Sequence, residues 1–230
     1  MTVDVNLPAY TTMENMLRLV DLLRRKNNDE KEVKPIFGLA DTTYRSTRSS
    51  LRKLGVIEES NLDFTELGRH IAYAANDEEK RNIILSIVSG YKPYQAVLDY
   101  VSTNGEVETD LNAVIAFWGR SKHGGSERNR KSAANLFGQI TEYAGLGSFV
   151  KWSYKSPSRI VWSTSLNSTL QHSAIPDMGM RADKDASGLY SRTVANVSER
   201  DTAEKSLNDT RGFFRSHISS GLRTPEVPVI

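Results

Sequence analysis

The chain has 230 residues, of which 38% are hydrophobic and 25% charged, so it can bury a core in one medium or two small domains. It contains no cysteine, which excludes disulfide bridges, thiolate metal sites and cysteine nucleophiles. The formal net charge of +2 decides nothing by itself, because what matters is where the charges lie. The sequence shows neither a membrane-length apolar run nor a signal-peptide pattern, so we expect a cytoplasmic protein with no membrane partner.

The first part, residues 1–103, has the pattern of a helical domain. Apolar residues at helical spacing behind capping residues predict helices that begin at Thr11, Val33, Thr43, Thr65, Asp77 and Pro93. Thr11 with Glu14 fits a capping box, and the helix over residues 43–54 stops at Gly55. Residues 56–58 and 62–65 surround a polar break and predict a short β-hairpin.

The second part, residues 104–163, follows a break at Asn104 and Gly105 and repeats this order of elements. Its predicted elements are a helix from Thr109, a glycine turn at 124–125, a helix over 126–144 and strands over 149–154 and 159–163. Helix, turn, helix, glycine and hairpin thus occur twice. This predicts an architectural repeat with little residue identity.

The third part, residues 164–230, has balanced charges and few large apolar residues, which is typical of a segment without its own core. The exception is residues 198–219, where Leu207, Phe214 and Ile218 could line one face of a helix. We expect a mostly extended tail whose one helix docks on a partner protein through these three side chains.

The helix predicted over residues 43–54 carries Arg45, Arg48 and Arg52 on one stripe, with Lys53 beside it and no acidic residue. Its core-facing residues are Tyr44, Thr47, Leu51 and Leu54. A cationic helix that follows a tight turn and precedes a hairpin has the layout of a helix-turn-helix reader, although a solvated basic helix is the plain alternative. The DNA contacts that we predict on it are Tyr44, Arg45, Arg48, Ser49, Arg52 and Lys53.

A second basic cluster surrounds the glycine turn. Backbone N–H groups at the start of the following helix favour an anion, and a nucleic-acid phosphate is the obvious candidate; a plain turn is the alternative. The DNA contacts that we predict here are Arg120, Lys122, Ser126, Arg128, Arg130 and Lys131.

The second hairpin interleaves aromatic and basic residues. Its aromatic residues are Phe149, Trp152, Tyr154 and Trp162. Such rings can stack on bases, but they more often pack a hairpin onto its own helices, which is the interpretation that we favour. Lys155 and Arg159 flank the tip of the hairpin, so we expect them to contact a nucleic-acid backbone.

Residues 43–69 resemble the winged-helix domains of bacterial and archaeal DNA-binding proteins. The shared motifs are a Leu-Gly-hydrophobic-Ile step, here residues 54–57, and a Thr-Glu-Leu-Gly-Arg helix start, here residues 65–69. Residues 133–147 are similar to the second half of tandem winged-helix proteins of prokaryotes, some of which lie near restriction or phage-defence systems. The resemblance implies a mainly α fold with small β-hairpin wings (α+β), with winged helix-turn-helix domains at 1–103 and 104–163. It also implies a role in transcription regulation or antiviral defence.

Motifs for catalysis are absent. The histidines are scattered without metal-ligand spacing, and no Gly-x-Ser-x-Gly occurs, so we expect no enzyme activity, no metal and no cofactor. We infer a non-catalytic protein that binds DNA through tandem winged helices. The alternative is a winged-helix adaptor that binds other proteins in a larger complex through its surface and its C-terminal helix. A homodimer would suit a palindromic site, although no heptads indicate one.

Overall fold

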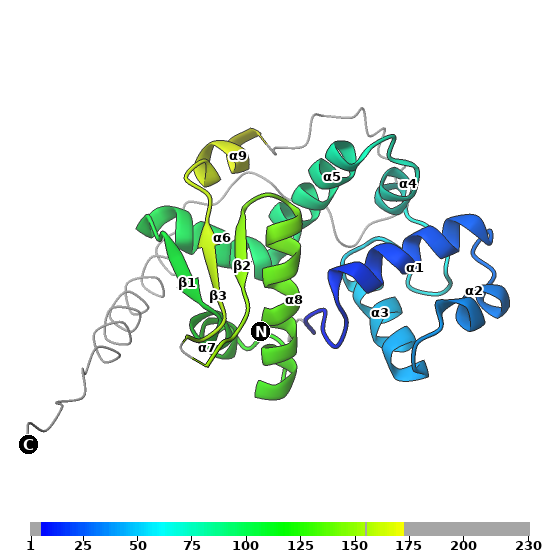
Figure 1. Ribbon diagram of the computed structural model, residues 1–230, viewed down its shortest axis with the longest axis horizontal. Coiled ribbons are helices and arrows are strands. Elements are labelled where there is room, and N and C mark those ends of the chain that lie inside the picture. The colour runs from blue at the N-terminus through cyan, green and yellow to red at the C-terminus, as the bar shows by residue number, and fades with distance from the viewer. Residues whose placement is uncertain (1–5, 155, 173–230) are drawn as a thin grey trace, which may run out of the picture. The chain divides into compact units, whose positions relative to one another are not determined.

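The computed structural model describes residues 6–154 and 156–172, and this part of the chain is mainly helical with one small antiparallel sheet (Figure 1). The expected α+β class is therefore confirmed. The described elements are α1 (Met13–Arg25), α2 (Glu30–Phe37), α3 (Asp41–Lys53), α4 (Glu66–Tyr73), α5 (Asp77–Gly90), α6 (Lys92–Asn104), β1 (Glu108–Asp110), α7 (Leu111–Arg120), α8 (Glu127–Tyr143), β2 (Gly147–Val150), β3 (Arg159–Trp162) and α9 (Leu166–His172).

Several helices begin at a capping residue whose side chain accepts a hydrogen bond from a backbone N–H group. Thr65 and Ser126 cap α4 and α8, as the sequence predicts. The capping box predicted at Thr11 was wrong by one residue, because Thr12 caps α1. The Thr11 hydroxyl lies instead 2.7 Å from that of Thr47, so it joins the segment before α1 to α3.

Two further helix starts differ from the prediction. Asn76 rather than Asp77 caps α5, and Asp110 rather than Thr109 caps α7. Thr109 belongs to β1, a strand that the sequence pattern missed, and its buried hydroxyl accepts a hydrogen bond of 2.8 Å from the Trp162 indole N–H. The strand is too short to show an alternating pattern of its own.

In the first half of the described chain, α1 packs against α2, α3 and α4. Leu19, Leu23, Phe37 and Leu51 are buried between these helices. The hairpin predicted after α3 is reduced to one antiparallel bridge, between Ile57 and Phe64.

Helix α4 closes directly on this bridged turn. A Cβ atom at Gly68 would lie 1.8 Å from the Val56 carbonyl oxygen, so only glycine fits. The Thr65 N–H donates to the same carbonyl at 3.2 Å. The segment 56–65 is therefore held against the helices on both sides of it.

In the second half, the sheet has the strand order β1-β3-β2, and all pairs are antiparallel. Helix α8 packs against α7 and β2, and Phe149 of β2 lies over Gly138 of α8. Tyr94, Trp118 and Phe137 form an aromatic core beneath it. The hairpin predicted after the second long helix is thus present as β2 and β3, and β1 pairs with the free edge of β3.

Helix α8 joins the two halves, because it contacts α1 and α5 as well as α7 and β2 (Figure 1). Gly105 ends α6 with φ 63°, which explains the break predicted there. The two predicted domains therefore share a core along α8.

The predicted tail begins with structure. Residues 166–172 form α9, and Leu166 is buried, which corrects the expectation of an extended chain from residue 164. The partner-binding residues Leu207, Phe214 and Ile218 lie outside the described residues. None of the described helices combines the length and the apolar character that crossing a membrane requires.

Candidate nucleic-acid interface

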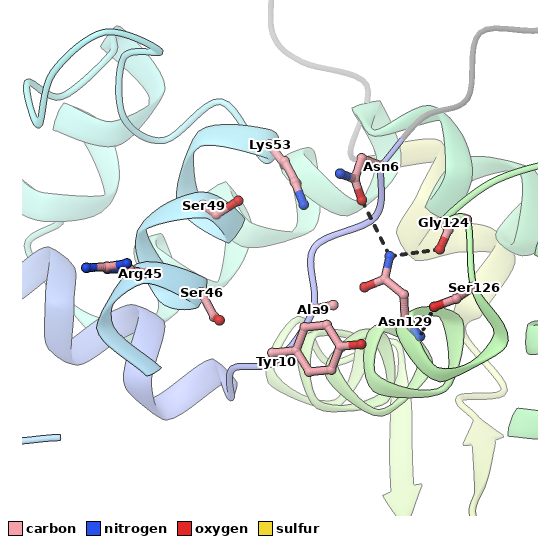
Figure 2. Close-up of a pocket in the computed structure, with 11 residues that line it drawn as sticks. Asn6, Ala9, Tyr10, Arg45, Ser46, Ser49, Lys53, Gly124, Ser126 and Asn129 are labelled. Carbon is pink, nitrogen blue, oxygen red and sulfur yellow. Dashed lines mark hydrogen bonds between the residues drawn. The ribbon is translucent and has the colours of Figure 1, made fainter. Parts of the chain in front are cut away.

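A polar cleft of about 630 Å³ lies between α3 and the turn that precedes α8 (Figure 2). Its lining residues are Asn6, Ala9, Tyr10, Arg45, Ser46, Ser49, Lys53, Gly124, Gly125, Ser126 and Asn129. Four of the residues predicted as DNA contacts are among them: Arg45, Ser49, Lys53 and Ser126. The fold thus brings part of each predicted cluster to the same cleft.

The segment before α1 fixes the two walls of the cleft relative to each other. The N–H of Ala9 donates to the Ser50 hydroxyl of α3 at 3.2 Å, and the N–H of Tyr10 donates to the Ser132 hydroxyl of α8 at 2.7 Å. Tyr10 has φ 58°, in the left-handed region that residues other than glycine rarely adopt. Its ring remains half-exposed in the cleft (Figure 2).

The turn before α8 is built from left-handed residues. Lys122, Gly124 and Gly125 have φ values of 56°, 76° and 57°. A Cβ atom at Gly124 would lie 2.6 Å from Cδ1 of Leu7, which is fully buried. The Asn129 amide donates to the Gly124 carbonyl at 2.8 Å, and this bond holds the turn against the first turn of α8 (Figure 2).

Two of the four basic side chains of α3 pair with nearby carboxylates. Nε of Arg45 lies 2.7 Å from Asp41, and a guanidinium nitrogen of Arg48 lies 2.7 Å from Glu30. The helix begins two residues earlier than predicted, which adds Asp41 to it. Exposed ion pairs of this kind contribute only about 0–1 kcal/mol, so a phosphate can replace the carboxylates as partner.

Asp41 also binds the ammonium of Lys34 at 2.6 Å. This hydrogen bond, together with the charges of Arg45 and Arg48, lowers the pKa of the Asp41 carboxyl group below its usual value. Asp41 therefore stays ionised at neutral pH and opposes an anion at this end of α3.

Arg52 and Lys53 donate to backbone carbonyl groups. Arg52 bonds to the carbonyl groups of Glu58 and Asn61 at 3.2 and 3.1 Å, and so braces the turn 56–65. The Lys53 ammonium lies 3.1 Å from the Leu7 carbonyl oxygen at the edge of the cleft, and burial lowers its pKa. Of these two side chains, only that of Lys53 lines the cleft.

Tyr44 is 1% exposed, and its ring packs edge-on against Phe37 at 5.7 Å. It therefore cannot contact DNA from this position, which corrects the prediction for this residue. Its core-facing position on the helix was the better guide.

The second cluster separates into exposed and packed residues. Arg128 and Lys131 are exposed on the first turns of α8, and no ion pair engages either of them within the described residues. Arg120 and Lys122 are exposed at the end of α7 and in the turn. Arg130 is partly buried and donates to the Gly125 carbonyl group, so its role is to support the turn.

The aromatic residues of the β2–β3 hairpin divide in the same way. Phe149 and Trp162 are buried, which confirms the packing prediction for them. Trp152 and Tyr154 are 71% and 94% exposed, so that prediction was wrong for this pair. Nε of Arg159 lies 3.1 Å from Glu108 on β1, and the other predicted backbone contact, Lys155, lies outside the described residues.

Besides the two glycines of the turn, five residues of the cleft are not among the predicted contacts: Asn6, Ala9, Tyr10, Ser46 and Asn129. Only tertiary contacts place residues 6–10 between two helices, and the backbone of Tyr10 has no sequence signature. Among the described residues, no group of three or more histidine and acidic side chains is arranged to hold a metal ion.

Comparisons with known proteins identify no relative of this chain. No protein-family model, curated protein or solved structure matches the chain.

Proposed function

We propose that this chain is a non-catalytic DNA-binding protein built from two winged-helix units, with α3 and α8 as their recognition helices. The order α6, β1, α7, α8, β2, β3, with β3 between the other two strands, is the arrangement expected of a winged helix. The first half offers α1, α2 and α3 followed by a wing reduced to one bridge.

The observation that carries this proposal is the meeting of both helices at one polar cleft. Arg45 and Lys53 supply positive charge from α3, and Ser46 and Ser49 supply hydroxyl groups between them. The start of α8 adds the backbone N–H groups and the partial positive charge of a helix N-terminus. Cations, hydroxyl groups and helix N-termini are the groups that proteins use to bind DNA phosphates.

The exposed residues Arg128 and Lys131 extend this surface along α8. They stand three positions apart, so they lie on one face of the helix. Because no carboxylate within the described residues pairs with them, they can bind phosphate without breaking an existing ion pair. We expect them to contribute more to DNA affinity than the paired arginines of α3.

The test is the affinity for a fluorescently labelled random duplex, measured by anisotropy across a salt series. The variant Arg128→Ala/Lys131→Ala should weaken binding and lower the slope of log K against log salt by about 2. The variant Lys80→Ala/Arg81→Ala removes the same charge from α5 and is the matched control. Absence of duplex binding by the unmodified protein at low salt would refute the proposal.

The adaptor function is the second candidate. Ile36 and Leu39, at the end of α2 and just after it, are 47% and 42% exposed, which is consistent with a protein contact on the first half. Deletion of residues 198–219 tests the part of this proposal that depends on the C-terminal segment. Loss of partner binding with retained DNA binding would assign the two functions to separate regions.

A further inference from the structure

Two solvent-exposed aromatic side chains lie near the tip of the β2–β3 hairpin. Trp152 is 71% exposed and Tyr154 is 94% exposed, whereas Phe149 and Trp162 of the same hairpin are buried. Rings of this size are among the largest apolar groups that a protein can bury. The hairpin therefore leaves unburied the two rings nearest its tip.

Backbone hydrogen bonds join the two arms of the hairpin next to its tip. Ser153 and Ser156 form an antiparallel bridge, with N–H to carbonyl distances of 3.0 and 3.2 Å in the two directions. Trp152 directly precedes Ser153 of this bridge and Tyr154 directly follows it, so the two rings stand on either side of Ser153 in the chain.

The hairpin extends toward the basic end of α8. The N–H of Leu146 donates to the Thr141 carbonyl at 3.0 Å, and Phe149 lies over Gly138, so β2 runs back along the helix. The tip consequently points toward the N-terminal end of α8, which carries Arg128 and Lys131 (Figure 1).

We propose that Trp152 and Tyr154 form a stacking platform for unpaired nucleobases, so that the protein binds DNA with a single-stranded segment more tightly than blunt duplex. This inference rests on the proposed DNA-binding function and specifies which form of DNA is bound. Aromatic rings beside a basic surface are how proteins bind single strands without reading their sequence.

The composition of the tip favours bases over a protein surface. Residues 151–154 are Lys, Trp, Ser and Tyr, with an exposed lysine and no aliphatic residue. The exposed Lys151 places a cation next to Trp152 in the chain. Stacking needs only flat rings and nearby cations to neutralise phosphates.

The experiment compares labelled oligo-dT, blunt duplex and duplex with a dT overhang by anisotropy. The variant Trp152→Ala/Tyr154→Ala should bind oligo-dT and the overhang duplex more weakly, by about tenfold or more for each stacked base that is lost. Its affinity for blunt duplex should change little. Trp152→Phe/Tyr154→Phe keeps both rings and should restore binding. Tyr73→Ala removes a ring that is 65% exposed on α4 and is the matched control.

Intrinsic fluorescence gives a second readout. Of the three tryptophans in the chain, Trp118 and Trp162 are buried, so oligo-dT should quench mainly the emission of Trp152. In Trp152→Phe the quenching should disappear while the anisotropy titration still shows binding. This pair of results identifies a stack and excludes a general loss of folding.

The outcomes separate the inference from the proposed function. Unchanged oligo-dT affinity in the double alanine variant, with duplex binding intact, overturns the stacking tip and leaves the helix surface standing; a protein is then the remaining partner for the tip. Ring-dependent oligo-dT binding that ignores Arg128→Ala/Lys131→Ala supports the tip and refutes the α8 surface. Absence of binding to all three DNAs overturns both.

Discussion

The segments that follow α3 and α8 both fold back on themselves, but their structures differ. Residues 56–65 form one bridge, which Arg52 braces and α4 covers. The β2–β3 hairpin pairs with a third strand and carries exposed rings at its tip. The first segment is thus engaged by its own helices, whereas the second leaves its tip available to a ligand.

Helices α3 and α8 also differ in how far their basic side chains are engaged within the fold. On α3, Arg45 and Arg48 pair with carboxylates and Arg52 pairs with backbone carbonyl groups. On α8, Arg128 and Lys131 are exposed without an ion pair in the described part of the chain. The arginines of α3 are thus engaged within the fold, whereas Arg128 and Lys131 of α8 are exposed.

The tight closure of α4 on residues 56–65 gives the largest expected effect. Gly68→Ala places a methyl group 1.8 Å from the Val56 carbonyl oxygen, and we expect a loss of about 3 kcal/mol or more in unfolding free energy. Gly90→Ala is the control, because a Cβ atom there would have no packing neighbour within 4 Å beyond its own helix backbone; it should change stability by less than about 1 kcal/mol. Urea unfolding followed by circular dichroism measures both. Equal stabilities for the two variants would show that α4 does not close on this turn.

The two ends of the β2–β3 hairpin can be compared by making the same substitution at each. Trp162→Phe removes the indole N–H that donates to Thr109 at 2.8 Å and leaves a buried hydroxyl without that partner. We expect a loss of about 1–3 kcal/mol. Trp152→Phe at the exposed tip should change stability by no more than about 0.5 kcal/mol. A similar loss for both would mean that the tip also packs.

Local patterns were enough to predict much of the fold. Thr65, Ser126 and Gly105 mark element ends through capping and left-handed backbone, which depend on neighbours in the sequence. β1 could not be predicted, because three residues show no alternation and their partner strand lies far along the chain. The split between buried Phe149 and exposed Trp152 was missed because it depends on where the sheet ends.

The candidate site was predictable only in part. The two basic clusters are visible as spacing, but their meeting at one cleft depends on residues 6–10, whose position is set by hydrogen bonds to α3 and α8. The carboxylate of Glu30 reaches Arg48 from a different helix. Charge compensation of this kind is a tertiary property, so the α3 stripe looked more available than it is.

The brace on the first turn gives a smaller effect. Arg52→Ala removes hydrogen bonds to the carbonyl groups of Glu58 and Asn61, and we expect a loss of about 1 kcal/mol. Arg45→Ala removes only an exposed pair with Asp41 and should stay within about 0.5 kcal/mol. Chemical denaturation of both variants checks this order. If Arg45→Ala were the more destabilising, Arg52 would be free to act as a ligand contact.

The smallest effect concerns the charge balance on α3. Because Lys34, with Arg45 and Arg48, lowers the pKa of Asp41 below 3.8, this group adds stability that is fully present above the unfolded-state pKa and is lost as pH falls through the folded-state value. The free energy of unfolding, measured at several pH values below 5, should therefore decrease less steeply with falling pH for Asp41→Asn than for the unmodified protein. Added salt should shrink the difference, because exposed charges are screened. The same variant should bind duplex DNA more tightly, since it removes an anion that competes with phosphate for Arg45. If its DNA affinity is unchanged, α3 does not contact the duplex, and α8 is then the sole recognition helix of the proposed interface.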